Sequence, residues 1–198
     1  MKLNERQEKL LTYVKHAHRK QFRKYTGLPY HTHLVSVARI AWDFLKETSF
    51  NKDMIIETAL LHDIIEDTPV SPVDLIDDLM DMGYTHDLSL SIVSAVLDLT
   101  DLYTTARFPQ VNRSKRKVLE AQRLANIPPF SQSIKYADLM DNTSDIMDND
   151  PGFGKIYLEE KAYIMSLMKM GHYPLYDACM MSMNENYGKI KGVHSYGK

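Results

Sequence analysis

The chain has 198 residues, of which 44% are hydrophobic and 25% are charged, and its formal net charge is −2. This size and composition fit one domain with a sizeable core, and the near-neutral charge argues against a general binder of nucleic acid or of anionic membranes. The single cysteine, Cys179, excludes an intrachain disulfide and favours a reducing compartment such as the cytoplasm. We expect no signal peptide in the charged N-terminal segment and no membrane span, because no apolar run approaches the length of a bilayer.

Apolar residues recur at helical spacing through most of the chain, and alternating strand-like segments with hairpin turns are missing. Local signals agree, because Asn51 is a suitable helix N-cap and Ser71-Pro72-Val73-Asp74 is typical of a helix start that Gly83 would end. We therefore predict an all-α bundle of eight or nine helices. The expected helices cover residues 3–17, 32–48, 51–62, 71–83, 86–100, 113–125, 131–147, 155–170 and 174–187.

We predict a single domain over residues 1–198, with a motif-bearing core at about 5–147 and further helices at 153–187. Methionines in these last helices fall at helical spacing, which favours an adaptable core or an oligomer surface. The longest irregular stretch, residues 101–112, is a candidate to line a site.

One helical segment carries more charge than an apolar helix usually tolerates. In residues 59–68, ALLHDIIEDT, His62 and Asp63 are adjacent, and Glu66 and Asp67 follow. Burying ionised carboxylates without a compensating charge is costly, and a bound metal cation is the simplest compensation. A mixed histidine and aspartate set suits manganese, iron, nickel or zinc better than calcium or magnesium.

On a regular helix, His62 and Asp63 would point about 100° apart, so neighbouring helices must supply further ligands. His33 and Asp138 are the candidates, although a capping histidine and a solvated helix acid are the commoner interpretations of each taken alone. Glu66 and Asp67 would follow the His-Asp pair by one helical turn on the same faces. A solvated acidic pair at a helix C-terminus is the alternative, which the helix dipole disfavours.

Three segments together resemble the hydrolase domain of the RelA/SpoT alarmone enzymes, and most closely their small stand-alone hydrolases of the HD superfamily. Residues 17–33, AHRKQFRKYTGLPYHTH, are similar to the opening motif of that family. Residues 59–68 are close to its ALLHDxxEDT signature, and residues 134–142, IKYADLMDN, are similar to its IKLADRxxN segment. The resemblance covers roughly residues 5–147.

The resemblance implies an HD-domain bundle that hydrolyses the 3′-pyrophosphate of guanosine tetra- or pentaphosphate, with a nucleotide as its partner and neither nucleic acid nor membrane. It implies a metal ion, usually manganese, held by His33, His62, Asp63 and Asp138. It implies that Glu66 and Asp67 handle the attacking water. It also implies that Arg23 and Lys24 lie near the substrate phosphates and Asn142 near the nucleotide, although a charge run is more often a solvated face.

The chain departs from the family pattern at three positions: Leu139 replaces a basic residue, Asp141 replaces a frequent histidine and Leu34 replaces a common proline. These changes bear on recognition of the base, so hydrolysis of an adenosine alarmone or of the 2′-phosphate of NADPH is an alternative. A non-catalytic nucleotide sensor is another, and a purely structural protein would leave the acidic apolar helices unexplained. Tyr30 and Tyr136 could stack on a base, but we expect both in the core.

Overall fold

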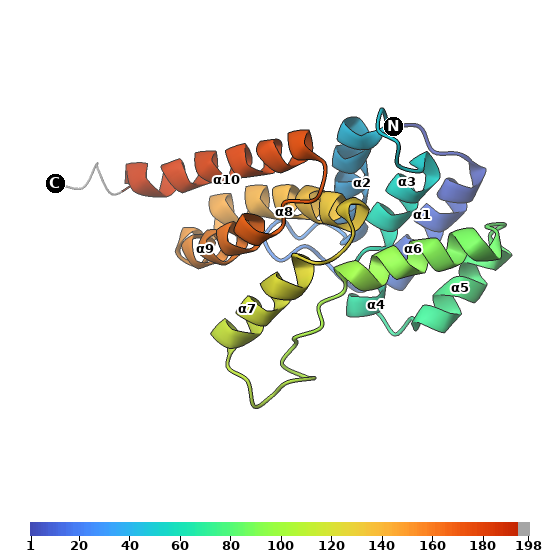
Figure 1. Cartoon of the computed structure of the whole chain (residues 1–198), viewed down its shortest axis with the longest axis horizontal. Helices are drawn as coiled ribbons and strands as arrows, with labels where there is room; N and C mark the ends of the chain where they lie inside the picture. Colours follow the sequence, from blue (N-terminus) through green and yellow to red (C-terminus); the bar gives the residue numbers. More distant parts are fainter. Residues whose placement is uncertain (194–198) are drawn as a thin grey trace. The chain divides into compact units, whose positions relative to one another are not determined.

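The structure is a computed structural model that describes residues 1–193, apart from the side chains of residues 145, 147, 148, 151 and 189–193. Within this part of the chain it contains ten α-helices and, in place of strands, one isolated β-bridge (Figure 1). The predicted all-α class is confirmed. Nine helices have ten residues or more, in agreement with the predicted number, and the remaining one, residues 64–67, is a single turn. The helices are α1 (Glu5–Ala17), α2 (His31–Leu45), α3 (Lys52–Leu61), α4 (Ile64–Asp67), α5 (Pro72–Asp81), α6 (His86–Leu99), α7 (Arg113–Leu124), α8 (Pro129–Asn149), α9 (Pro151–Leu167) and α10 (Tyr173–Val193).

The chain divides into two compact units, Met1–Asp101 and Leu102–Lys198. The first unit is built around α3, which packs against α1, α2 and α6. All seven residues from 55 to 61 are buried, as expected of a helix surrounded by others. Helices α4 and α5 complete the unit by packing against α6. The single domain over the whole chain stays a prediction.

The predicted helix ends in the first unit are confirmed at atomic detail. The side chain of Asn51 accepts hydrogen bonds from the N–H groups of Asp53 and Met54, which begins α3. Ser71 and Asp74 form a reciprocal capping box at the start of α5. Gly83 follows that helix with a φ of 94°, a left-handed conformation that glycine adopts without strain.

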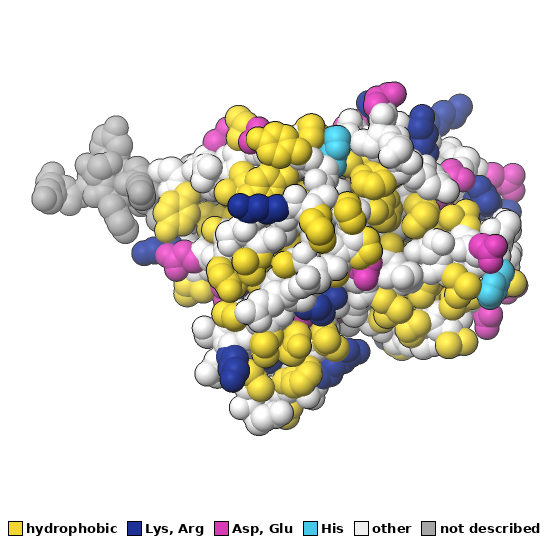
Figure 2. Space-filling view, viewed as in Figure 1, with side chains coloured by type: hydrophobic (Ala, Val, Ile, Leu, Met, Phe, Trp, Pro, Cys, Tyr) yellow, Lys and Arg dark blue, Asp and Glu magenta, His cyan; other side chains and the backbone are white. Residues whose placement is uncertain are grey.

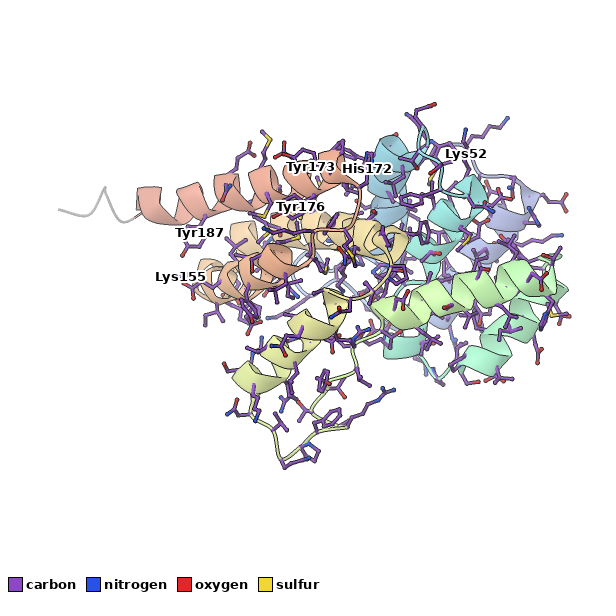
Figure 3. The ribbon with its side chains drawn as sticks, in the orientation of Figure 1. Lys52, Lys155, His172, Tyr173, Tyr176 and Tyr187 are labelled. Carbon is purple, nitrogen blue, oxygen red and sulfur yellow. The ribbon has the colours of Figure 1, made fainter. Side chains whose placement is uncertain are left out.

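The second unit consists of α7 to α10, in which α8 packs against α9 and α10, and α9 also contacts α7 and α10. Tyr136 on α8 is fully buried, which confirms its predicted place in the core, and its hydroxyl donates to the carbonyl of Met168 at 2.8 Å. The ring of Tyr176 packs edge-on against Tyr136, and Tyr173 stacks on Tyr176 at the start of α10 (Figure 3).

The methionines near the end of the chain are partly in the core, and the predicted oligomer surface stays a prediction. Met165, Met168 and Met183 are buried, whereas Met181 is 57% exposed on α10. Hydrophobic side chains are visible on the outer face of α10 (Figure 2). Within residues 1–193, no helix combines the length and the apolar character needed to cross a membrane.

Candidate metal centre

The His-Asp pair lies in a break between two helices, next to the predicted helix end at residue 62. Helix α3 ends at Leu61 and α4 begins at Ile64. Asp63 has φ −102° and ψ 0°, outside the helical region, and its carbonyl accepts the first hydrogen bond of α4 from the N–H of Asp67 at 2.9 Å. The separation of about 100° applies to a regular helix through both residues, and the backbone of Asp63 departs from one.

The turn brings one carboxylate oxygen onto two imidazole rings. Asp63 Oδ2 lies 3.0 Å from His62 Nε2 and 3.7 Å from His33 Nε2. The rings of His33 and His62 pack edge-on, with centroids 5.1 Å apart, and their candidate ligand atoms lie within 4.8 Å of one another. Both histidines are about 1% exposed. Three of the four predicted ligands thus converge in the first unit.

The donor set of this cluster fits a divalent transition metal. His62 Nδ1 lies 2.9 Å from the carbonyl oxygen of Ala59, which can only accept, so Nδ1 carries the proton. In the neutral ring, the Nε2 lone pair then faces Asp63 Oδ2, and two acceptors 3.0 Å apart repel unless a proton or a cation lies between them. An outward N–H held by a backbone carbonyl is also the usual arrangement of a metal-binding histidine.

Tyr30, which we expected in the core, belongs to this cluster. Its hydroxyl donates to Asp63 Oδ2 at 2.6 Å, and its ring stacks on buried His18. His18 Nδ1 hydrogen-bonds to Gln21, whose amide donates to the carbonyl of Asp67 at 2.7 Å. The opening motif over residues 17–33 contains His18, Gln21 and Tyr30. Only the contact of Tyr30 with Asp63, 33 positions away, shows what Tyr30 does.

The two predicted catalytic acids occupy different surroundings. Both residues are exposed overall, but desolvation of the Asp67 carboxyl, and next the nearby carboxylate of Asp63, raise the pKa of Asp67. Asp67 therefore lies within the electrostatic reach of the cluster. Glu66 is exposed, and its Oε2 accepts a hydrogen bond from the N–H of Asp101 at 2.8 Å. This bond joins α4 to the beginning of the irregular stretch after α6.

The predicted phosphate-binding residues lie in the connection between α1 and α2. The chain turns back on itself there, with a bridge between Phe22 and Pro29 and with Arg23 N–H donating to the carbonyl of Leu28 at 2.8 Å. Arg23 is half-buried. Lys24 is exposed, and its ammonium lies over the ring of Tyr25.

The remaining predicted residues lie on α8, in the second unit. Asp138 is held from two sides: Lys135 Nζ lies 2.8 Å from Oδ2, and Asn142 Nδ2 donates to Oδ1 at 2.6 Å. Each carboxylate oxygen can accept more than one partner, so both contacts leave room for a further ligand bond. Asn142 thus orients Asp138 in this structure. Lys135, to which we assigned no role, does the same.

Comparisons with known proteins agree with the predicted family. No family model matches the chain. The guanosine-3′,5′-bis(diphosphate) 3′-pyrophosphohydrolase MESH1 of Mus musculus is 30% identical over 135 residues, which are 68% of this chain and 65% of that protein. MESH1 of Drosophila melanogaster is 28% identical over 142 residues, 71% of this chain and 69% of that protein. The chain thus spans about two thirds of the length of these relatives.

A solved structure of a metazoan orthologue of SpoT, a protein that hydrolyses ppGpp, has the same fold. It superposes with a TM-score of 0.72 over 96% of this chain and 97% of that one, at 22% identity. The chain is thus similar in sequence to the MESH1 hydrolases and has the fold of the SpoT orthologue. The turn between α3 and α4 carries the residues that resemble the HD signature, His62 and Asp63.

Proposed function

We propose that this protein is a metal-dependent hydrolase of guanosine 3′-diphosphate 5′-di- or triphosphate, releasing pyrophosphate and GDP or GTP. The observation that carries the proposal is the convergence of His33, His62 and Asp63 in a chain related to MESH1. The activity of MESH1, together with that of the SpoT orthologue, supports the reaction and the guanosine substrate.

The proposed ion is Mn²⁺, held by His33, His62 and Asp63 of the first unit, with Asp138 as the fourth ligand on the strength of the sequence motif. When bound, such an ion lowers the pKa of a coordinated water and polarises a phosphoryl oxygen. Other divalent transition metals satisfy the same donor set, so metal availability would select among them.

The carboxylates beside the cluster are proposed to handle the attacking water. Asp67 takes its proton, which the raised pKa of this carboxyl supports, and Glu66 holds the water in line with the leaving oxygen. Arg23 and Lys24 are proposed to contact the substrate phosphates, and Asn142 the nucleotide. The nucleotide is the proposed partner and the cytoplasm the proposed location, while self-association of the chain stays a prediction that light scattering would test.

The experiment is a substrate panel with the purified, manganese-loaded protein and an EDTA control. Pyrophosphate release is measured for guanosine and adenosine alarmones, and phosphate release for NADPH. Metal-dependent release from the guanosine alarmone alone is the expected result. Turnover of the adenosine alarmone or of NADPH would instead make the alternative substrates correct, and Leu139, which is buried on α8, would be the first position to examine. Bound metal without any turnover would favour the nucleotide sensor.

Two variants separate the proposed roles within the site. Asp63→Ala is expected to abolish both manganese binding and turnover, because it removes the oxygen that both imidazoles face. Glu66→Ala is expected to retain the metal but to lose about two or more orders of magnitude in rate. Asp77→Ala, an exposed acid on α5, is the matched control. Retained turnover in the first variant, or lost metal in the second, would refute these roles.

A further inference from the structure

A pocket of the first unit lies between α1 and α2. Both helices pack against α3, and the space between them has a volume of about 350 Å³, within the range of small-molecule sites. Two residues come from α1 and five from α2. They are Leu11, Lys15, His31, Thr32, Val35, Ser36 and Arg39.

The lining has the chemistry of an anion site. Lys15 and Arg39 bring two positive charges, and none of the seven lining residues is acidic. Among the described side chains, neither cation lies within ion-pair distance of a carboxylate, whereas Arg6 and Lys9 of α1 both do. Both cationic side chains are exposed, and two positive charges at one pocket favour an anion there.

Hydroxyl and apolar groups complete the pocket. The Ser36 side chain adds a hydroxyl donor to the lining, while Thr32 already donates to the carbonyl of Pro29 at 2.8 Å. Leu11 and Val35 supply an apolar wall. A ligand that matches this lining has an oxyanion with several acceptor oxygens, joined to a small apolar group that covers the wall.

The pocket is separate from the HD cluster. Thr32, Ser36 and Arg39 recur at spacings of four and three residues and so share one side of α2. His33 is buried, and none of the seven lining residues is a proposed metal ligand. An occupant of the pocket would therefore contact residues other than the proposed ligands.

We propose that the α1–α2 pocket binds a small phosphorylated molecule through Lys15, Arg39 and Ser36. The site is independent of the proposed hydrolysis, because none of these three residues belongs to the proposed catalytic set.

Calorimetric titration with inorganic pyrophosphate tests this proposal. The full-length protein is stripped of metal with EDTA and desalted, so that binding at a metal centre does not contribute. We expect saturable binding with a Kd below about 1 mM, and a loss of about tenfold in affinity in both Lys15→Gln and Arg39→Gln. Lys9→Gln, which alters an exposed lysine of the same helix, is expected to bind as the unmodified protein does.

Two further variants decide the location of the anion. Ser36→Asp places a negative charge in the pocket and should abolish binding, with circular dichroism to verify that the variant is folded. Arg23→Gln, which alters a proposed substrate contact, should leave binding unchanged. The proposal is overturned by absence of saturable binding, by an affinity of Lys15→Gln and Arg39→Gln equal to that of the unmodified protein, or by a loss in Arg23→Gln alone. Since no turnover is measured, failure of this proposal differs from failure of the proposed hydrolysis.

Discussion

At the residue scale, Tyr30 restrains the carboxylate that both metal-binding candidates face. Its hydroxyl donates to Asp63 Oδ2, the same oxygen that lies 3.0 Å from His62 Nε2. A partner of this kind positions a ligand without itself touching the ion. Tyr30 thereby selects one orientation of the Asp63 side chain in the turn between α3 and α4.

The change Tyr30→Phe removes this donor and keeps the ring on His18. We expect manganese affinity to fall by about 10- to 100-fold, as for other partners of metal ligands. Titration of Mn²⁺ measured by calorimetry gives the dissociation constant. Tyr25→Phe, which removes a hydroxyl in contact with Lys24, is the control. Unchanged affinity in Tyr30→Phe would show that Asp63 needs no such support.

Glu57 is a buried acid that the proposed reaction does not use. Its Oε1 accepts from Gln7 Nε2 at 3.1 Å and from the Tyr84 hydroxyl at 3.0 Å, while Oε2 has no hydrogen-bond partner among the described residues. Burial raises the pKa of Glu57 to about 7. Because this value lies above that of the unfolded chain, the group favours the folded state at low pH, and this contribution is lost as the pH rises to about 7.

The change Glu57→Gln keeps an acceptor for Gln7 and Tyr84 but cannot ionise. In the unmodified protein, ionisation of Glu57 should lower the unfolding free energy by about 3 kcal/mol between about pH 5 and about pH 8. We expect this decrease to be absent in the variant. Urea unfolding at both pH values, compared between the variant and the unmodified protein, measures this difference. Parallel pH dependences would mean that Glu57 titrates normally in the folded protein.

At the element scale, Gln132 of α8 joins two chain segments of the second unit. Its Nε2 donates to carbonyl groups at the end of α7, including those of Leu124 and Ile127, and its Oε1 accepts from the N–H groups of Met170 and Gly171. These are backbone groups that helix ends leave without intrahelical partners. Glycine is required at position 171, because an added Cβ would lie 2.4 Å from the Tyr136 ring.

The change Gln132→Leu keeps the side-chain volume and removes every one of these hydrogen bonds. Leaving several buried backbone groups unsatisfied should lower the unfolding free energy by about 3 kcal/mol. The control is Gln122→Leu on the exposed side of α7, for which a change within about 0.5 kcal/mol is expected. Equal stability of the two variants in urea unfolding would contradict this role of Gln132.

At the scale of the whole molecule, metal binding should appear as thermal stability. A ligand at about 100 times its Kd stabilises the folded state by about 2.7 kcal/mol, which for a chain of this size raises the Tm by about 5–10 °C. We expect this shift with Mn²⁺, its reversal by EDTA and its absence in Asp63→Ala. A shift of the same size in Asp63→Ala would place the ion elsewhere.

The helices were predictable where their signals are local. The start of α5 after its N-cap Ser71 is determined by residues within one turn, and so is its end just before Gly83. Both predicted ends are confirmed. The direction in which the turn between α3 and α4 points Asp63 was not predictable in this way, because apolar residues keep a helical spacing across the turn. Periodicity describes which face is buried, and it does not register a change in the backbone of one residue such as Asp63.

The sequence by itself determined the all-α class, the helix caps and the family resemblance, because periodic hydrophobicity, capping residues and the HD signature are all written in neighbouring positions. Only the tertiary structure decided how the HD turn aims Asp63 at His33, that Tyr30 holds this carboxylate, and that Glu57 is shared by Gln7 and Tyr84. Tyr30 and Asp63 are 33 positions apart, and Gln7 and Glu57 are 50 apart. Contacts at such separations depend on how the helices pack. The physical reason is that a buried polar group meets its hydrogen-bond partners only once the core is assembled.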